Sequence, residues 1–308
     1  MRMKVLIAGG SGYIGRHLSD SLLKDGHQVV VFTRRQAQPA GRSAPRMVTW
    51  DARSAEATWV SELSGADAIV NLAGTSIGGL RWTRRHMAEI LSSRLGATTA
   101  LVKAIERTSA DRRPKVLVSA SGIDYYGDRG DEVITEESSP GDSFLARVCQ
   151  QWEAAAAKAE ALGVRVVRIR TSMVFGRGAP AFRLLVLPFQ LFAGGPLGNG
   201  RQWFTWIHLD DLVRLYRLGI EDGRLSGPVN AVAPDIRRER ELAREIGQVL
   251  HRPGVVPAPA FALRLALGQE SQLLLHGRHA LPAKAQLTGF EFRLGGLREA
   301  LQDALVRR

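Results

Sequence analysis

KVLIAGGSGYIG, residues 4–15, decides the fold of this chain. Its first five residues form an apolar run that predicts a buried strand, and the spacing of Ile14, Leu18 and Leu22 predicts a helix over 12–24. Between the two stands the glycine triplet Gly9-x-x-Gly12-x-x-Gly15. A strand, a glycine-rich turn and the start of a helix form the context in which such a triplet binds a dinucleotide.

The residue types of this turn suit a pyrophosphate group. Glycine lets the backbone turn tightly and approach the phosphates, and the first turn of the helix offers free N–H groups and a positive dipole end. A plain tight turn is the alternative. We expect the cofactor to contact every residue of the turn: Gly9, Gly10, Ser11, Gly12, Tyr13, Ile14 and Gly15.

Strands and helices alternate through the first half of the chain. Apolar runs predict further strands at 28–32, 47–50, 68–72, 115–119 and 164–170. Helical spacing predicts helices at 84–107 and 144–162. Because the strands are apolar on both faces, the pattern predicts an α/β fold, a Rossmann-like doubly wound parallel sheet covered by helices on both sides.

The rhythm changes after Arg170. Residues 176–202 are rich in Gly and Pro, and helices are expected at 209–221, 239–250 and 297–305, with a strand at 229–232. We therefore expect a nucleotide-binding domain made of 1–175 plus 203–232. The remainder, 176–202 plus 233–308, is expected to form a smaller, mainly helical C-terminal lobe for the substrate.

The end of the second strand indicates which nucleotide binds. An NAD site usually has Asp or Glu there to bind the ribose hydroxyl, whereas here Arg34 and Arg35 follow the strand. Two guanidinium groups suit a 2′-phosphate, which favours NADP(H); otherwise both are solvated surface charges. Asp51, after the third strand, is placed either to bind the adenine amino group or to close a turn.

The fourth strand ends in Asn71-Leu72-Ala73-Gly74. A glycine here allows the backbone to pass close to the cofactor ribose, so Leu72, Ala73 and Gly74 are expected to line it. Arg81 and Arg94 are candidates for the cofactor phosphates or an anionic substrate. For both, an ordinary structural position is the alternative.

The composition excludes several classes of protein. Hydrophobic residues make up 45% and charged residues 23% of 308 residues, which excludes wholesale disorder. Cys149 is the only cysteine, which excludes disulfides and cysteine-rich zinc sites. No apolar run reaches the roughly 18 residues that span a membrane. The N-terminus has the pattern of a strand and not of a signal peptide, so the expected compartment is the cytoplasm.

A net charge of +12 raises the question of nucleic-acid binding. The basic residues are nearly all arginine and are spread along the chain without a dense block, so we expect no nucleic-acid partner. The expected partner is a small molecule, unidentified, with no membrane partner, for a monomer or homodimer.

The motifs above resemble those of the extended short-chain dehydrogenase/reductases. A closer resemblance is to the epimerase-like family of putative nucleoside-diphosphate-sugar epimerases that carries its own C-terminal domain of unknown function. The residues that carry it are Asn71–Gly74, Arg81-Trp82-Thr83, Ser93-Arg94, Ser119-Ala120-Ser121, Tyr125-Tyr126-Gly127, residues 142–146, Trp152-Glu153, residues 194–202, residues 206–211, Leu281-Pro282 and Gly289-Phe290. The resemblance covers nearly the whole chain and implies an NADP(H)-dependent oxidoreductase or epimerase acting on a small polar carbonyl or sugar compound.

The superfamily's catalytic Tyr-x-x-x-Lys pair is missing. No tyrosine has a lysine four residues on, and the two positions implied by the resemblance hold Leu145 and Cys149. Three hypotheses remain. Tyr126 (or Tyr125) is the acid/base with an arginine as partner; His208 or Asp210 serves instead; or the protein binds NADP(H) without turnover, as a sensor or regulator.

The remaining candidates follow from the same resemblance. Ser121, with Ser119 as second choice, stands where the superfamily's serine polarises a carbonyl. Arg201, Gln202 and Trp203, at the end of a glycine-rich loop, are the candidates for substrate contact.

His276-x-x-His279 lacks a third ligand, so no metal is expected. We expect Cys149 to be buried and inert, and an Asp before the helix at 209–221 to act as its N-cap.

Overall fold

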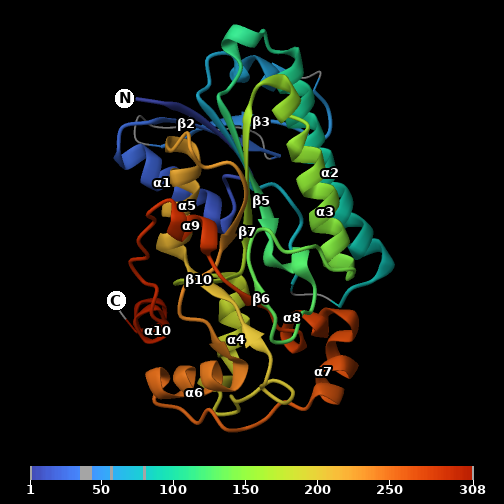
Figure 1. Ribbon diagram of the computed structural model, residues 1–308, viewed down its shortest axis with the longest axis vertical. Coiled ribbons are helices and arrows are strands. Elements are labelled where there is room, and N and C mark those ends of the chain that lie inside the picture. The colour runs from blue at the N-terminus through green and yellow to red at the C-terminus, as the bar shows by residue number, and fades with distance from the viewer. Residues whose placement is uncertain (1, 35–43, 56–57, 79–80, 307–308) are drawn as a thin grey trace.

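A computed structural model describes residues 2–34, 44–55, 58–78 and 81–306. Its centre is a sheet of seven strands in the order β11-β7-β5-β4-β1-β2-β3, and every neighbouring pair is parallel (Figure 1). The strands are β1 (Lys4–Ala8), β2 (Gln28–Thr33), β3 (Arg46–Thr49), β4 (Ala68–Asn71), β5 (Val116–Gly122), β7 (Arg165–Thr171) and β11 (Gly227–Ala231). The order of the strands along the chain reverses between β1 and β4, and open α/β sheets bind their ligands at the carboxyl edge beside such a point.

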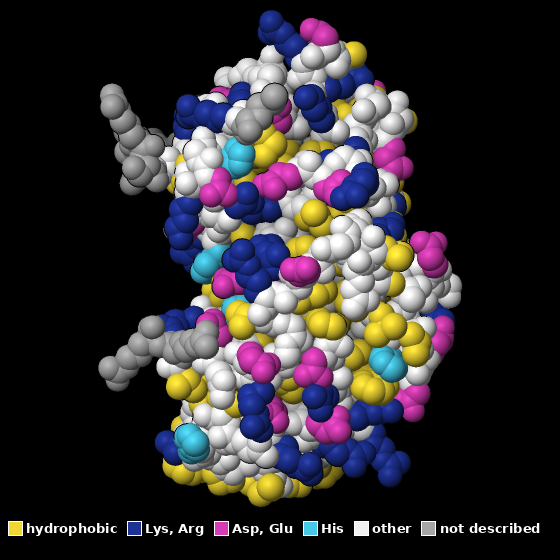
Figure 2. All heavy atoms as spheres, turned by 60° about the vertical axis from the view of Figure 1, so that its left-hand side comes forward, with side chains coloured by type: hydrophobic (Ala, Val, Ile, Leu, Met, Phe, Trp, Pro, Cys, Tyr) yellow, Lys and Arg dark blue, Asp and Glu magenta, His cyan; other side chains and the backbone are white. Residues whose placement is uncertain are grey.

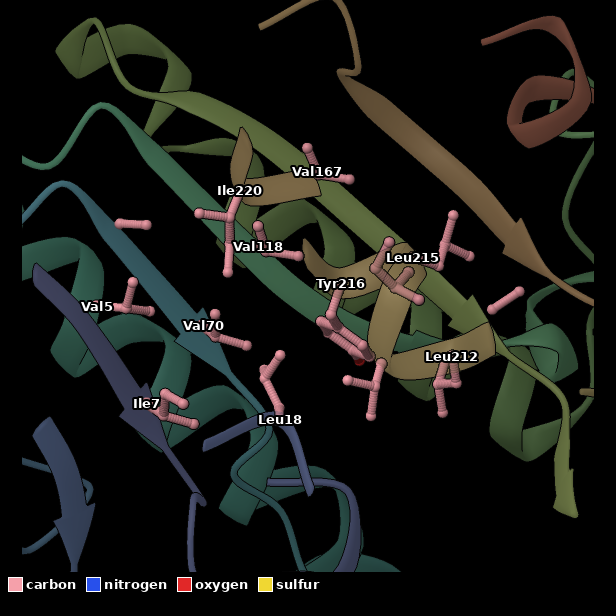
Figure 3. Packing of buried hydrophobic residues seen from close by; sticks show 14 of the residues in the cluster. Val5, Ile7, Leu18, Val70, Val118, Val167, Leu212, Leu215, Tyr216 and Ile220 are labelled. Atoms are coloured by element: carbon pink, nitrogen blue, oxygen red, sulfur yellow. The ribbon is translucent and has the colours of Figure 1, made fainter. Parts of the chain in front are cut away.

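Helices cover both faces of this sheet, as the apolar strands predicted. Val5 and Ile7 of β1 face α1 (Tyr13–Lys24) and α5 (Leu209–Glu221), where they pack with Leu18 and Tyr216 (Figure 3). Leu6 and Ala8 point the other way, toward α2 (Arg84–Arg107) and α3 (Phe144–Ala157). Successive residues of β1 thus enter two cores, which explains why β1 carries no polar face.

Most of the predicted boundaries are confirmed. The helices α2, α5, α6 (Glu239–Leu250) and α10 (Leu297–Leu305) have the bounds that the sequence indicated. Helix α2 begins where it does because the Thr83 hydroxyl accepts a hydrogen bond from the His86 N–H at 3.1 Å. Helix α3 ends at Ala157, before the expected end, and a separate short turn, η4 (Glu160–Leu162), follows.

A mainly helical lobe lies beyond the carboxyl edge of the sheet (Figure 1). Helices α4 (Pro180–Gln190), α6 and α10 share a core that includes Phe182, Leu242 and Leu301. Short strand pairs lie outside the main sheet: β8 (Met173–Phe175) with β10 (Trp206–His208), β9 (Trp203–Phe204) with β12 (Arg237–Arg238), and β6 (Val133–Ile134) with β13 (His279–Ala280). The remaining helices are α7 (Ala260–Leu267), α8 (Gln272–Leu275) and α9 (Ala283–Leu287).

Within the described ranges, no helix combines the length and the apolar character needed to cross a membrane.

Candidate functional site

The glycine turn lies at the carboxyl end of β1, where the reversal of strand order puts it. Gly9 has φ +78°, and a Cβ there would lie 2.7 Å from the carbonyl carbon of Leu72. A Cβ on Gly10 or Gly15 would also collide, with Val31 and with the turn itself respectively. These three glycines are required by the packing of the turn, whatever binds to it.

Gly12 differs from the other three. It has an ordinary φ of −75°, and the nearest atom to a Cβ built on it is the Gly9 carbonyl oxygen, at 3.2 Å. Apart from that oxygen, no atom of the described residues outside the neighbouring turn lies within 4 Å of the Cβ position, so the side of Gly12 away from Gly9 is open. No side chain caps helix α1 there, and the first turn of the helix carries no acidic residue. An uncapped helix start with open space in front of it suits a phosphate group.

The loop after β4 lies against this turn and is held in place by Asn71 and by side chains of α2. The Asn71 amide donates to Thr98 at 2.9 Å, and its oxygen accepts the N–H of Ala73 at 3.2 Å. Gly74 lies on Arg94, whose guanidinium donates to the Thr75 carbonyl at 2.9 Å. The backbone of Leu72 and Ala73 thus lies beside Gly9 of the glycine turn; that these residues and Gly74 line the cofactor ribose stays a prediction.

Arg94 is half-buried and structural in its contacts. Besides Thr75, its guanidinium donates to the Ile90 carbonyl at 3.0 Å and lies 5.0 Å from the centre of the Trp152 ring. Burial lowers the pKa of Arg94. It supports the loop over which a cofactor would lie. Arg81 is exposed and lies against Gly268 of the lobe.

At the expected adenosine end of the site, Arg34 lies directly after β2 and is exposed. Arg35 lies outside the described residues. The Asp51 carboxylate accepts the N–H groups of Arg53 and Ser54, both at 3.0 Å, and these bonds lower its pKa, with that from Ser54 the larger cause. Asp51 therefore closes a turn, the second of the two roles considered for it.

Tyr13 connects the glycine turn to the lobe. Its hydroxyl donates to the Arg177 carbonyl at 2.8 Å, and burial, followed by the charge of Asp210, raises the pKa of Tyr13 to about 12. The contact fixes the start of α1 against the segment that leads into α4. Ile14 packs against the core of the sheet, and Ser11 is exposed.

The predicted catalytic hydroxyl groups are in the interior. The Ser121 hydroxyl donates to Glu153 at 2.7 Å, and Ser119 is 1% exposed with its hydroxyl directed at the Ala120 carbonyl, 3.3 Å away. Glu153 in turn binds Arg170 through two bonds of 2.8 Å. Ser121 is thus one member of a buried ionic network and is not directed into an open site.

Tyr126 belongs to the same network. Its hydroxyl donates to the Asn230 side chain at 2.8 Å and accepts from Arg170 at 2.6 Å, and the residue has no exposed surface. Burial raises the pKa of Tyr126 to about 12 in spite of the guanidinium beside it. This geometry argues against the hypothesis that Tyr126 protonates a substrate. Tyr125 is partly exposed, with the Arg170 guanidinium 3.5 Å from the centre of its ring.

Leu145 and Cys149, which stand in the places of the acid/base pair, lie side by side on α3 below the end of β5. A Cβ on Gly122 would be 3.4 Å from the Cys149 sulfur. Cys149 is buried, and burial raises the pKa of its thiol to about 12, so it is inert as expected. Neither residue can exchange a proton with a ligand at neutral pH.

Polar groups that the sequence analysis did not select occupy this place. A hollow of about 10 Å³, room for one water molecule, lies beside Leu145. Asp124 lines it and pairs with Arg278 at 2.8 Å, and Arg278 also donates to the Gly127 carbonyl at 2.7 Å. His276 lines the same hollow. The other lining residues are Trp82, Ser143, Gln272 and Leu273.

Asp124 comes from the turn after β5, whereas His276 and Arg278 come from the C-terminal segment. Among the described residues, none forms a hydrogen bond or ion pair with the His276 imidazole. The only sequence signal for this group was the pair His276-x-x-His279, which was considered for a metal alone.

The predicted substrate loop is tied to the lobe. The Gln202 amide donates to the carbonyls of Leu197 and Leu274 at 3.0 and 2.9 Å. Trp203 stacks on His279 with the ring centres 4.0 Å apart, and its indole donates to Asp131. Only Arg201 is exposed. Gln202 and Trp203 hold the lobe together, while Arg201 remains free to meet a ligand.

The other proposed acid/base group, His208, is structural in its contacts. Its Nδ1 accepts the Asp210 N–H at 3.2 Å, so His208 caps helix α5. The expectation of an aspartate cap is therefore wrong: Asp210 and Asp211 lie inside the first turn, where carboxylates also suit the helix dipole. Burial lowers the pKa of His208.

In the ranges that the structure covers, no three His, Cys, Asp or Glu side chains are grouped so as to hold a metal ion.

Comparison with known families gives two matches along the chain. The model described as "NAD dependent epimerase/dehydratase family" matches residues 5–231. The model described as "Domain of unknown function (DUF1731)" matches residues 258–304. The second match contains His276 and Arg278, so the small hollow is formed between the two matched regions.

Curated relatives match over nearly the whole length. The chain is 39% identical over 306 residues to the chloroplastic epimerase family protein SDR39U1 homolog of Arabidopsis thaliana, which covers 98% of this chain and 86% of that protein. It is 36% identical over 307 residues to epimerase family protein YfhF of Bacillus subtilis, with 99% of each chain covered.

Two solved structures are similar in fold and sequence. The structure of human epimerase family protein SDR39U1 (isoform 2) with NADPH has a TM-score of 0.86 at 33% identity, covering 98% of this chain and 99% of that one. The nucleoside-diphosphate sugar epimerase from Corynebacterium glutamicum has a TM-score of 0.79 at 32% identity, covering 99% of this chain and 58% of that one.

Proposed function

The chain belongs to the NAD dependent epimerase/dehydratase family, and from that premise we propose that it binds NADP(H) and transfers hydride to or from a small polar carbonyl or sugar compound. The observation that carries this proposal is the open space at Gly12, in front of the uncapped start of α1. A packed structural turn has no need of that space. A dinucleotide pyrophosphate would fill it and accept the free N–H groups.

The choice of NADP(H) over NAD(H) rests on Arg34. It is exposed at the end of β2, where the ribose of the adenosine half lies in this fold, and an arginine there matches a 2′-phosphate. The human relative described above was crystallised with NADPH, which supports the same choice.

The cofactor, when bound, supplies the hydride donor or acceptor. The chain must then move one proton at the substrate oxygen. Tyr126, Ser119 and Ser121 are held in buried hydrogen bonds, whereas the hollow beside Leu145 is lined by polar groups. We assign the proton to His276, which has an imidazole without a partner among the described residues. The ion pair between Arg278 and Asp124 holds the segment that carries His276 in this position.

A second candidate function is supported by a specific observation. Leu145 and Cys149 occupy the positions of the acid/base pair and cannot transfer protons. A regulator that binds NADP(H) without turnover would need the glycine turn and no proton donor. In that case the hollow beside Leu145 would have no chemical role.

One experiment separates the two candidates. NADPH binding is measured by fluorescence titration, and NADPH oxidation is then followed over a panel of aldehydes, ketones, quinones and nucleotide-sugars. The oxidoreductase requires a compound whose reduction falls about 10²–10⁴-fold in His276→Gln, the usual contribution of general acid catalysis. His279→Gln is the matched control, since His279 is stacked on Trp203 and should leave turnover unchanged. Absence of NADPH binding would refute both candidates.

A further inference from the structure

A group of exposed hydrophobic side chains lies at the far end of the lobe, away from the sheet. Leu191 is 67% exposed, Phe192 59% and Val255 77%, and Leu187 and Val256 are about half exposed. We call these five residues the end patch. Figure 2 shows hydrophobic side chains along the lower end of the molecule, with Lys and Arg side chains beside them.

The end patch is assembled from two segments distant in the sequence. The Val256 N–H donates to the Gly194 carbonyl at 3.1 Å, and Leu197 pairs with Ala258, so the segment after α4 runs beside the segment before α7. Shortly after Val256, α7 presents Phe261 and Leu265, each about three quarters exposed. The apolar surface is therefore a fixed feature of the fold and not a loose chain end.

Phe192 has an unusual backbone conformation for an exposed aromatic residue. Its φ is +62°, in the left-handed region that costs a bulky residue energy, and its ring projects outward. A glycine would adopt this backbone without cost. Residues held in such backbone conformations cluster at active sites, ligand clamps and switch regions.

The two segments that form the end patch carry basic residues and no acidic ones. No Asp or Glu occurs between Glu160 and Asp210, or between Glu245 and Glu270, and these are the intervals that contain both segments. Arg183, Arg244 and Arg264 make no ion pair with any residue that the structure describes. The nearest acidic residue along α6, Glu245, is bound to Arg298.

An open basic hollow adjoins the apolar side chains. It measures about 540 Å³ and is lined by Arg244, His251, Arg252 and Val255, together with Gly247, Gln248, Pro253 and Gly254. The Arg252 guanidinium lies 4.4 Å from the centre of the Phe192 ring. Cationic groups that can take a phosphate are thus in direct contact with side chains that can enter an acyl layer.

We propose that the end patch docks this protein on an anionic membrane surface, with Phe192 and its neighbours among the acyl chains and the arginines on lipid phosphates. A combination of exposed apolar anchors and a basic rim is what binds a protein to the surface of such a membrane. A second copy of the chain fits less well, because pairing two identical patches would bring the unpaired arginines of both together.

This inference revises the expectation of no membrane partner, which rested on the absence of a spanning segment. It is independent of the proposed cofactor site, which lies at the sheet edge. The apolar runs at 184–193 and 255–263 are visible in the sequence, but a sequence alone does not show that both lie side by side on the surface.

The test uses the full chain and flotation with two kinds of vesicle, pure phosphatidylcholine and equal parts phosphatidylcholine and phosphatidylglycerol. Wild type should float with the anionic vesicles alone and be released by high salt. Phe192→Gly should weaken binding about tenfold to a hundredfold, the value of burying one phenylalanine. Each of Arg183→Gln, Arg252→Gln and Arg264→Gln should weaken it about fivefold.

Phe192→Gly carries its own folding control. It relieves the backbone strain, so its melting temperature should equal or exceed that of wild type, and its NADPH titration should match wild type. Failure of wild type to bind anionic vesicles would overturn the proposal, as would binding that persists in these variants. If wild type sediments as a dimer and binds no vesicles, and Phe192→Gly sediments as a monomer, the patch would instead be an interface with a second copy. If wild type binds inorganic phosphate but does not float with anionic vesicles, the hollow would instead be a site for a soluble anion.

Discussion

Two glycines of one turn should respond in opposite ways to the same added methyl group. Gly9→Ala and Gly12→Ala each place a Cβ in the turn between β1 and α1. At Gly9 this atom would lie 2.7 Å from backbone atoms of Leu72, on a residue with φ +78°. At Gly12 the φ is ordinary and the nearest atom is 3.2 Å away. The first substitution should therefore damage the fold, and the second only the proposed ligand site.

The magnitudes follow from these contacts. For Gly9→Ala, the left-handed backbone costs about 1–2 kcal/mol and the forced shift of Leu72 about 1–3 kcal/mol, which together lower the free energy of unfolding by about 2–5 kcal/mol. For Gly12→Ala, the loss is below about 1 kcal/mol, the cost of alanine at an N-cap. Displacing a phosphate from two N–H groups, each worth about 1.5–3 kcal/mol, should weaken NADPH at least about a hundredfold.

The assays are urea unfolding followed by tryptophan fluorescence, and NADPH fluorescence titration of each folded variant. If both substitutions lower the free energy of unfolding equally, the distinction between Gly9 and Gly12 is wrong, because the space at Gly12 would then be filled by protein. Wild-type NADPH affinity in a folded Gly12→Ala protein would refute the placement of the phosphates.

Three further outcomes are expected. Arg34→Ala should weaken NADPH about tenfold to a hundredfold and leave NADH unchanged, since one charged contact is lost; equal losses in parallel titrations would contradict this. Tyr126→Phe should cost about 1–3 kcal/mol in urea unfolding, because Asn230 loses its buried donor, with NADPH affinity unchanged. Burial raises the pKa of Glu239 from 4.5 to about 7, although its carboxylate accepts the Leu197 N–H. Between these two pH values the folded state therefore holds a proton that the unfolded state has lost. The free energy of unfolding should fall by about 3 kcal/mol as the pH rises from 4.5 to 7. Glu239→Gln should flatten that part of the stability profile, and an unchanged slope would contradict the assignment.

The parts of the fold that depend on local sequence were predictable. Helix α2 begins at a threonine that caps it and runs through continuous helical spacing, so both ends were found. The strand β1 was found because a strand buried on both faces has to be apolar throughout. The glycine turn was found because its geometry allows few other residues.

The parts of the site that depend on distant partners were not predictable. Tyr126 looked like an acid/base group because a resemblance placed it near the nicotinamide pocket. Its role is set by Asn230 and Arg170, which reach it from other strands. A single sequence carries no sign of these contacts, because no local pattern connects residues that far apart.

The C-terminal segment also reaches the end of β5 through a contact between residues distant in the sequence. Arg278 is 9% exposed and pairs with Asp124, so neither charge can be removed from this position without leaving the other buried and unpaired. That pair holds the segment with His276 against the end of β5, beside the Leu145 and Cys149 that cannot move protons. Under the proposed oxidoreductase function, Leu145 and Cys149 cannot move the proton, and the C-terminal segment carries the group assigned to it. Asp124→Asn should then lower turnover in the NADPH oxidation assay while NADPH still binds in the fluorescence titration, because the pair that positions His276 is lost.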